Sequence, residues 1–87
     1  SYEPTKSALD GRELLGRQLR YWRQERGMTQ EQLAHNAGFD RSFLVEVENG
    51  RHSCTLDRLF DLASALDVDA HLLIATQGSS AADGFGV

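Results

Sequence analysis

Polar side chains gather on one face of residues 41–49, and their types suit contact with the edges of DNA bases. Arginine and serine near the start of a helix can reach base edges in the major groove. A glutamate can accept a hydrogen bond from cytosine N4, or it can remain solvated. At about 100° per residue, Phe43, Leu44 and Val47 share the inward face. The outward residues are Arg41, Ser42, Val45, Glu46 and Asn49.

The histidines and the cysteine show no spacing that indicates catalysis or metal binding. His35, His52 and His71 are scattered and match no metal spacing, and no base is paired with Cys54 to activate it as a nucleophile. A single cysteine forms no internal disulfide, which fits a reducing, cytoplasmic setting. No Gly-rich phosphate loop and no paired carboxylates occur. The sequence therefore predicts no enzyme activity, no metal and no cofactor.

The length of 87 residues suits one small domain. No run of 18 apolar residues occurs, so no membrane span is expected. The net charge of −4 by itself disfavours DNA, because phosphate contacts need cations. However, residues 1–26 hold six of the nine basic residues and four of the thirteen acidic ones. Eight of the nine are arginine, which suits bidentate contacts to phosphate or guanine, so the net charge decides little.

Four helices are predicted, each preceded by a residue that commonly caps a helix. Gln32 adds a capping box to the second helix, and Gly38 suits the left-handed position that ends it. The fourth helix has a wide apolar stripe, which predicts packing on more than one neighbour: Leu56, Leu59, Phe60, Leu62, Ala63 and Leu66. The helices cover 11–26, 30–37, 41–49 and 56–66, after the caps Asp10, Thr29, Asp40 and Thr55.

The second and third predicted helices form a helix-turn-helix unit. They meet across Gly38 within 20 residues, and the small side chains of Ala34 and Ala37 permit a close crossing. Leu33 and Leu44 fill that crossing. The predicted fold class is therefore an all-α bundle of about four helices that contains a helix-turn-helix.

The pattern changes after the fourth helix. Residues 70–76 form a short apolar run in which Ala70, Leu72 and Ile74 alternate onto one face, and this favours a β-strand over a fifth helix. A lone strand needs a partner, most simply the same strand of a second subunit, so these three residues are predicted to dimerise the protein. The predicted domain covers 10–76, with an N-terminal arm over 1–9 and a flexible tail over 77–87.

Residues 15–66 resemble the phage Cro/repressor (XRE-type) helix-turn-helix family. The matching words are LGRQLR from Leu15, GMTQEQLA from Gly27, AG at 37–38, EVENG from Glu46 and TLD from Thr55. The resemblance implies a lambda-repressor-like bundle that binds a palindromic operator on double-stranded DNA as a homodimer. Its third helix would lie in the major groove, and the protein would be a transcriptional repressor.

The resemblance also implies roles for individual residues. Arg41, Ser42 and Glu46 fall at base-reading positions, with Val45 on the same face. Gln30 and Asn49 fall at phosphate-contact positions, and Arg51 follows in the loop. The family's partly buried Arg–Glu pair matches Arg23 and Glu48, and the helical wheel independently places both at the edges of their apolar stripes.

The segment that begins Ala65-Leu66-Asp67-Val68 and ends in an apolar run is similar to HipB-type antitoxins. In those proteins a C-terminal strand pairs across the dimer. This resemblance implies a protein that represses its own operon and binds a HipA-like, kinase-like toxin. The alternatives are a stand-alone phage-type repressor and the helix-turn-helix module of a larger regulator, each without a toxin partner.

Overall fold

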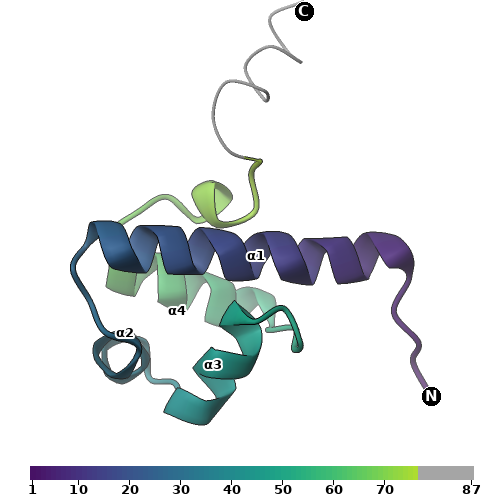
Figure 1. Cartoon of the computed structure of the whole chain (residues 1–87), viewed down its shortest axis with the longest axis horizontal. Coiled ribbons are helices and arrows are strands. Elements are labelled where there is room, and N and C mark those ends of the chain that lie inside the picture. Colours follow the sequence, from purple (N-terminus) through teal and green to yellow (C-terminus); the bar gives the residue numbers. More distant parts are fainter. Residues whose placement is uncertain (77–87) are drawn as a thin grey trace, which may run out of the picture.

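Four α-helices and one short 3-10 helix make up residues 1–76, the part of the chain that the computed structural model describes (Figure 1). The all-α class with a helix-turn-helix is confirmed. The flexible tail predicted over 77–87 lies outside the described residues. No helix among residues 1–76 is both long and apolar enough to cross a membrane. The elements are α1 (Lys6–Glu25), α2 (Gln30–Ala37), α3 (Arg41–Glu48), α4 (Leu56–Leu66) and the 3-10 helix η1 (Ala70–Leu73).

The caps predicted for α2 and α4 are confirmed. The Thr29 hydroxyl accepts from the Gln32 backbone N–H at 3.0 Å, and the Gln32 side chain accepts from the Thr29 N–H at 2.9 Å. This is the predicted capping box. The Thr55 hydroxyl accepts from the Arg58 N–H at 3.2 Å. Each contact satisfies an N–H that has no partner within its own helix, so these starts are set locally.

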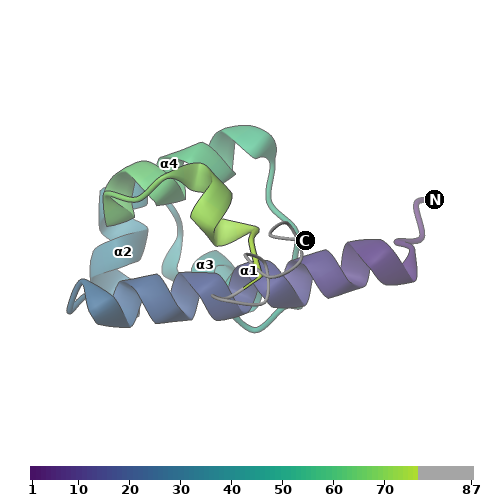
Figure 2. The same cartoon turned by 90° about the horizontal axis from the view of Figure 1, so that it is seen from above.

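The start predicted for α1 and the side-chain cap predicted for α3 need correction. α1 begins at Lys6 rather than Gly11, because the Thr5 hydroxyl caps it by accepting from the Ala8 N–H at 3.1 Å. Residues 6–9 of the predicted N-terminal arm are therefore helix, and this part of α1 extends past the rest of the bundle (Figures 1 and 2). Asp40 does precede α3, but its carboxylate accepts from the Ser42 hydroxyl at 3.0 Å instead of from a backbone N–H.

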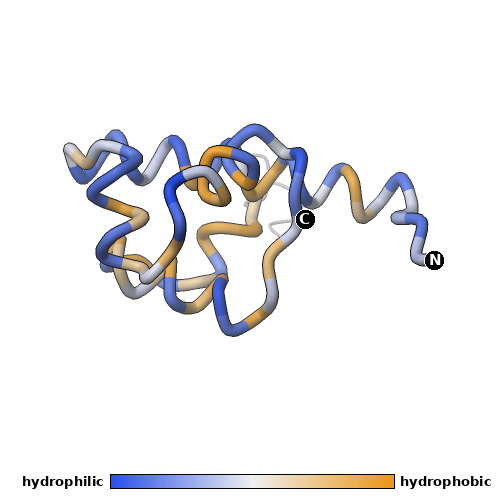
Figure 3. The backbone as a smooth tube through the Cα atoms, turned by 90° about the horizontal axis from the view of Figure 1, so that it is seen from below, coloured by the Kyte–Doolittle hydropathy of each residue, from blue (hydrophilic) through white to orange (hydrophobic). Residues whose placement is uncertain are grey.

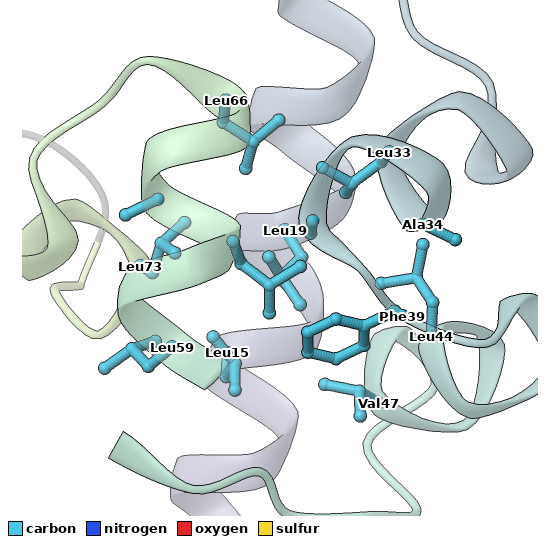
Figure 4. Close-up of a cluster of buried hydrophobic side chains, with 13 residues drawn as sticks. Leu15, Leu19, Leu33, Ala34, Phe39, Leu44, Val47, Leu59, Leu66 and Leu73 are labelled. Atoms are coloured by element: carbon cyan, nitrogen blue, oxygen red, sulfur yellow. The ribbon is translucent and has the colours of Figure 1, made fainter. Parts of the chain in front are cut away.

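The hydrophobic core lies where all five elements meet (Figures 3 and 4). Its large side chains with no more than 2% exposure come from every element. They are Leu19, Leu33, Leu44, Val47, Leu62, Leu66 and Leu73. The crossing of α2 and α3 uses Leu33, Ala34, Ala37 and Leu44 as predicted, together with Phe39 from the turn.

The strand predicted over 70–76 is wrong for Ala70–Leu73, which forms η1 instead. An isolated strand would leave its backbone groups unpaired, whereas the turn satisfies some of them locally, through Leu72 N–H to Asp69 O at 3.0 Å. The helical turn also directs Leu73 into the space between α1 and α4, where it is fully buried. Alternation would have placed Leu73 on the face opposite to Leu72 and Ile74.

Part of the wide stripe on α4 lies outside this core. Leu59, Leu62, Ala63 and Leu66 are buried, but Leu56 is 69% and Phe60 is 56% exposed. The two exposed residues are four positions apart and therefore lie on one face of α4. The core of residues 1–76 thus accounts for only part of the stripe.

Candidate nucleic-acid interface

The turn between α2 and α3 is held by backbone conformation and by a buried ring. Gly38 adopts the left-handed conformation with φ of 74°, as predicted, which lets the chain reverse after α2. The Phe39 N–H then donates to the Ala34 carbonyl at 2.8 Å. The Phe39 ring is buried against the core next to Leu44 and Val47 (Figure 4). The angle between the two helices is therefore fixed by packing.

Arg58 of α4 fastens this turn from outside. Its Nη1 donates to the Gly38 carbonyl at 3.2 Å, and its guanidinium lies over the Phe39 ring, 4.8 Å from the centroid. Such a cation–π contact adds to the anchoring of the ring. The sequence pattern carried no signal for this role, because residues 20 apart along the chain make the contact.

The C-terminal end of α3 is fixed to α1 through Glu48. The Glu48 side chain is 1% exposed and receives Arg23 in a two-pronged contact, Nε to Oε2 at 2.7 Å and Nη2 to Oε1 at 3.1 Å. Arg23 also donates to the Met28 carbonyl at 3.1 Å. Gln30 Nε2 donates to Glu48 Oε1 at 3.1 Å. One carboxylate therefore links α1, the start of α2 and the end of α3.

Gly16 lets the backbones of α1 and α3 approach at this point. A Cβ built on Gly16 would lie 2.3 Å from the Glu48 carbonyl oxygen and 2.9 Å from the Val47 oxygen. The same Glu48 oxygen accepts from Arg20 Nη2 at 2.9 Å. Position 16 must therefore lack a side chain if α3 is to keep its position against α1.

Three arginines bind backbone carbonyls at or just after helix ends. The last carbonyls of a helix have no partner within it and carry partial negative charge. Arg20 binds Glu48 O at the end of α3, and Arg58 binds Gly38 O after α2. Arg26 binds Leu66 O at 2.7 Å and Asp67 O at 2.9 Å after α4. These side chains stabilise the bundle.

The outward face of α3 carries the polar residues predicted from the spacing. Arg41, Ser42 and Asn49 are exposed, whereas Val45 and Glu46 are half-buried. Asn49 is the C-cap residue, so α3 ends at Glu48, one residue earlier than expected. The Ser42 hydroxyl is engaged by Asp40, as described above. Arg41 forms no ion pair with any carboxylate of residues 1–76.

Glu46 and Arg51 form a second, solvent-facing ion pair at this face. Arg51 Nε donates to Oε1 at 3.0 Å and Nη2 donates to Oε2 at 2.7 Å. The side-chain exposures are 39% for Glu46 and 60% for Arg51. The hydrogen bonds from Arg51 hold the pKa of Glu46 below its ordinary value, and the same contact raises the pKa of Arg51. Both side chains are therefore charged at neutral pH.

The remaining predicted site residues are Gln30 and the three residues predicted to dimerise the protein. The Gln30 side chain is half-buried and bonded to Glu48. The phosphate contact implied for this position is therefore left to its backbone N–H, at the start of α2. Of the residues predicted to dimerise the protein, Ala70 and Leu72 are half-buried, and Ile74 is 55% exposed. Cys54 is partly buried, which raises the pKa of its thiol and keeps it protonated near neutral pH.

Comparison with known proteins agrees with this geometry. A family model described as a helix-turn-helix domain matches residues 14–74. An uncharacterized HTH-type transcriptional regulator of Sinorhizobium fredii, y4dJ, is 37% identical over 68 residues, which cover 78% of this chain and 87% of the relative. The immunity repressor protein of Bacillus phage phi105 is 32% identical over 63 residues, covering 72% of this chain and 44% of the repressor.

A solved structure shares both sequence and fold. The restriction-modification controller protein C.AhdI from Aeromonas hydrophila superposes with a TM-score of 0.69 and 37% sequence identity. The match covers 71% of this chain and 94% of that chain. The aligned part is therefore most of the bundle described above.

Proposed function

This chain belongs to the family of XRE-type helix-turn-helix domains, and we propose that it is a dimeric transcriptional repressor that binds a palindromic operator on double-stranded DNA. The role needs no catalysis, cofactor or metal, and it places the protein in the cytoplasm beside the DNA. Proteins similar to this chain are named as a transcriptional regulator, a controller protein and a repressor, which supports the proposal.

The observation that carries the proposal is the outward face of α3. Arg41 lies in the first turn with an exposed guanidinium and no ion-pair partner among residues 1–76. A guanidinium there can contact O6 and N7 of guanine in a major groove. The helix behind it packs against α1 and α2, and Arg58 of α4 holds the turn that precedes it. A rigid helix with a free, correctly placed donor is what direct readout of a base requires.

Replacing Arg41 with alanine is expected to weaken operator binding by about 1–3 kcal/mol, because one bidentate base contact is lost. The measurement is fluorescence anisotropy on a labelled fragment of the gene's own upstream DNA and on a scrambled fragment, across a salt series. The wild type should prefer its own fragment and lose affinity steeply with salt, since phosphate contacts release counterions.

Asn49→Ala is the comparison for the Arg41 experiment. A phosphate contact carries no sequence information, so this variant should weaken binding to both fragments alike. Wild-type binding that is weak, flat with salt and equal for both fragments would contradict DNA recognition by this chain.

The exposed apolar residues of α4 and the segment after η1 suit contact with a second copy of the chain. Leu56, Phe60 and Ile74 are each more than half exposed, and Leu56 and Ile74 line the same surface hollow. A palindromic operator requires two copies related by a two-fold axis, and a two-fold interface uses one patch on both subunits. We therefore assign dimerisation to these three residues and keep Ile74 from the sequence prediction.

Phe60→Asp is expected to convert the dimer to a monomer, because a carboxylate in an apolar interface is left without a partner. Light scattering after size exclusion should give 9.7 kDa in place of twice that mass. Tyr21→Asp, at a 42% exposed aromatic residue of α1, is the control and should remain dimeric. An unchanged mass for Phe60→Asp, with helical content retained, would rule out this interface.

The antitoxin hypothesis rested on Ala65-Leu66-Asp67-Val68 followed by an apolar strand, and Ala70–Leu73 of that segment form η1 instead of a strand. Autoregulation of a shared operon and binding of a kinase-like toxin therefore remain predictions from the resemblance to HipB-type antitoxins. The two alternatives, a stand-alone repressor and a module of a larger regulator, use the same α3 face and the same DNA-binding test.

A further inference from the structure

Arg51 is tied to Glu46 by both its backbone and its side chain. The Arg51 N–H donates to the Glu46 carbonyl at 2.9 Å, because Gly50 turns the chain back with φ of 74°. The guanidinium then donates one hydrogen bond to each oxygen of the Glu46 carboxylate. A half-buried glutamate on a helix surface would ordinarily sample several rotamers, but this arrangement favours a single orientation on the outward side of α3.

Both partners keep hydrogen-bonding capacity after forming the pair. A guanidinium has five N–H donors, and the edge that contains Nη1 is not used by Glu46. A carboxylate has about four lone-pair sites, of which Arg51 takes two. One remaining edge can thus donate to a phosphate while the other can accept from a base.

An unpaired carboxylate on this face would be repelled by DNA phosphates. Arg51 offsets that charge without covering the carboxylate completely, since 39% of the Glu46 side chain remains exposed. Among base edges in the major groove, cytosine presents a donor that no acceptor accompanies on the same base. Guanine and thymine present acceptors, to which a carboxylate cannot bind. Adenine presents its donor beside the acceptor N7, which does not favour a carboxylate.

We propose that Glu46 and Arg51 act as one unit that recognises cytosine. Arg51 is the positioning residue: it orients the Glu46 carboxylate to accept from a cytosine amino group and donates its free edge to the neighbouring phosphate. This inference rests on the proposed function, since it assigns base specificity within the same DNA interface.

The test compares the base preferences of the wild type with those of Glu46→Ala, Arg51→Ala and Arg51→Lys. A duplex selected by the wild type from a randomised library is re-synthesised with each base pair at every position, and affinities are measured by competition. At one position the wild type should prefer cytosine by about 10-fold, the lower range for a good base contact. Replacing that cytosine with a 2-pyrimidinone nucleotide, which lacks the amino group, should cause the same loss.

Glu46→Ala should abolish that preference, and Arg51→Ala should reduce it to about 2-fold or less while binding also weakens on all sequences. Arg51→Lys keeps the charge but not the two-pronged geometry. Compared with Arg51→Ala, it should therefore recover more of the affinity for all sequences than of the preference for cytosine. Lys6→Ala is the matched control: it also removes an exposed cation paired with a carboxylate, at 2.9 Å from Asp10, and should leave every preference unchanged.

The outcomes separate this inference from the proposed function. A wild type that selects no sequence would contradict the proposed function and the inference with it. A wild type that selects a sequence, but whose cytosine preference is unchanged or stronger in Arg51→Ala, would overturn the inference alone. Equal thermal midpoints for all variants would show that the differences arise at the DNA.

Discussion

Replacing Gly16 with alanine is expected to destabilise the protein by about 3 kcal/mol, at the upper end of the usual cost of overpacking. The added methyl group would lie 2.3 Å from the Glu48 carbonyl oxygen, and all three of its nearest atoms, each within 3 Å, belong to the α3 backbone. A side chain can rotate away from such a contact, whereas a helix backbone can only move as a whole. Urea unfolding followed by circular dichroism measures the change.

Gly11→Ala is the matched control, because Gly11 lies five residues earlier in the same helix. A Cβ at Gly11 would meet nothing within 4 Å, and alanine is a better helix former than glycine. This variant should therefore gain about 0.5–1 kcal/mol. Equal effects of the two substitutions would contradict the close approach of α1 and α3.

Replacing Glu48 with alanine is expected to cost about 3–5 kcal/mol, because it leaves the largely buried Arg23 guanidinium without its counter-charge. Arg23 is 13% exposed and would retain only the Met28 carbonyl. Gln30 would lose its acceptor as well. Urea unfolding at neutral pH should show a lower midpoint with an unchanged slope.

Glu46→Ala offers a control two residues away on the same helix. Glu46 is also paired with an arginine, but both members of that pair face solvent, so the loss of Glu46 should leave the unfolding midpoint nearly unchanged. Replacing Arg23 and Glu48 together by methionine should recover much of the loss, since no charge is then buried alone. A similar loss from Glu46→Ala and Glu48→Ala would refute the distinction between the two pairs.

Gly16→Ala and Glu48→Ala should also affect DNA binding, because both change the contact between α3 and α1. Glu48 receives Arg20 at its carbonyl, Arg23 at its carboxylate and Gly16 against its backbone. A shift of α3 at this point would move Arg41 and Asn49 relative to the groove. We expect Gly16→Ala to weaken operator binding even at temperatures where it remains folded.

The amino-acid sequence was sufficient to predict the features that depend on neighbouring residues. The starts of α2 and α4, the left-handed Gly38 and the outward polar face of α3 all follow from caps and helical periodicity. The Arg23–Glu48 pair was implied by the family resemblance, and the position of each residue at the edge of an apolar stripe supported it. These signals act within one or two helical turns, so they are readable without knowing how the helices pack.

The long-range contacts became visible only in the folded chain. Gly16 looks like any helical glycine until the α3 backbone lies against it, and Arg20, Arg26 and Arg58 look like surface cations until helix ends point at them. Likewise, an alternating run predicted a strand, but packing against α1 and α4 favoured a turn that buries Leu73. The physical reason is common to all: the acceptor, the obstructing backbone or the apolar surface is supplied by a distant segment, and its position depends on the packing of the whole bundle.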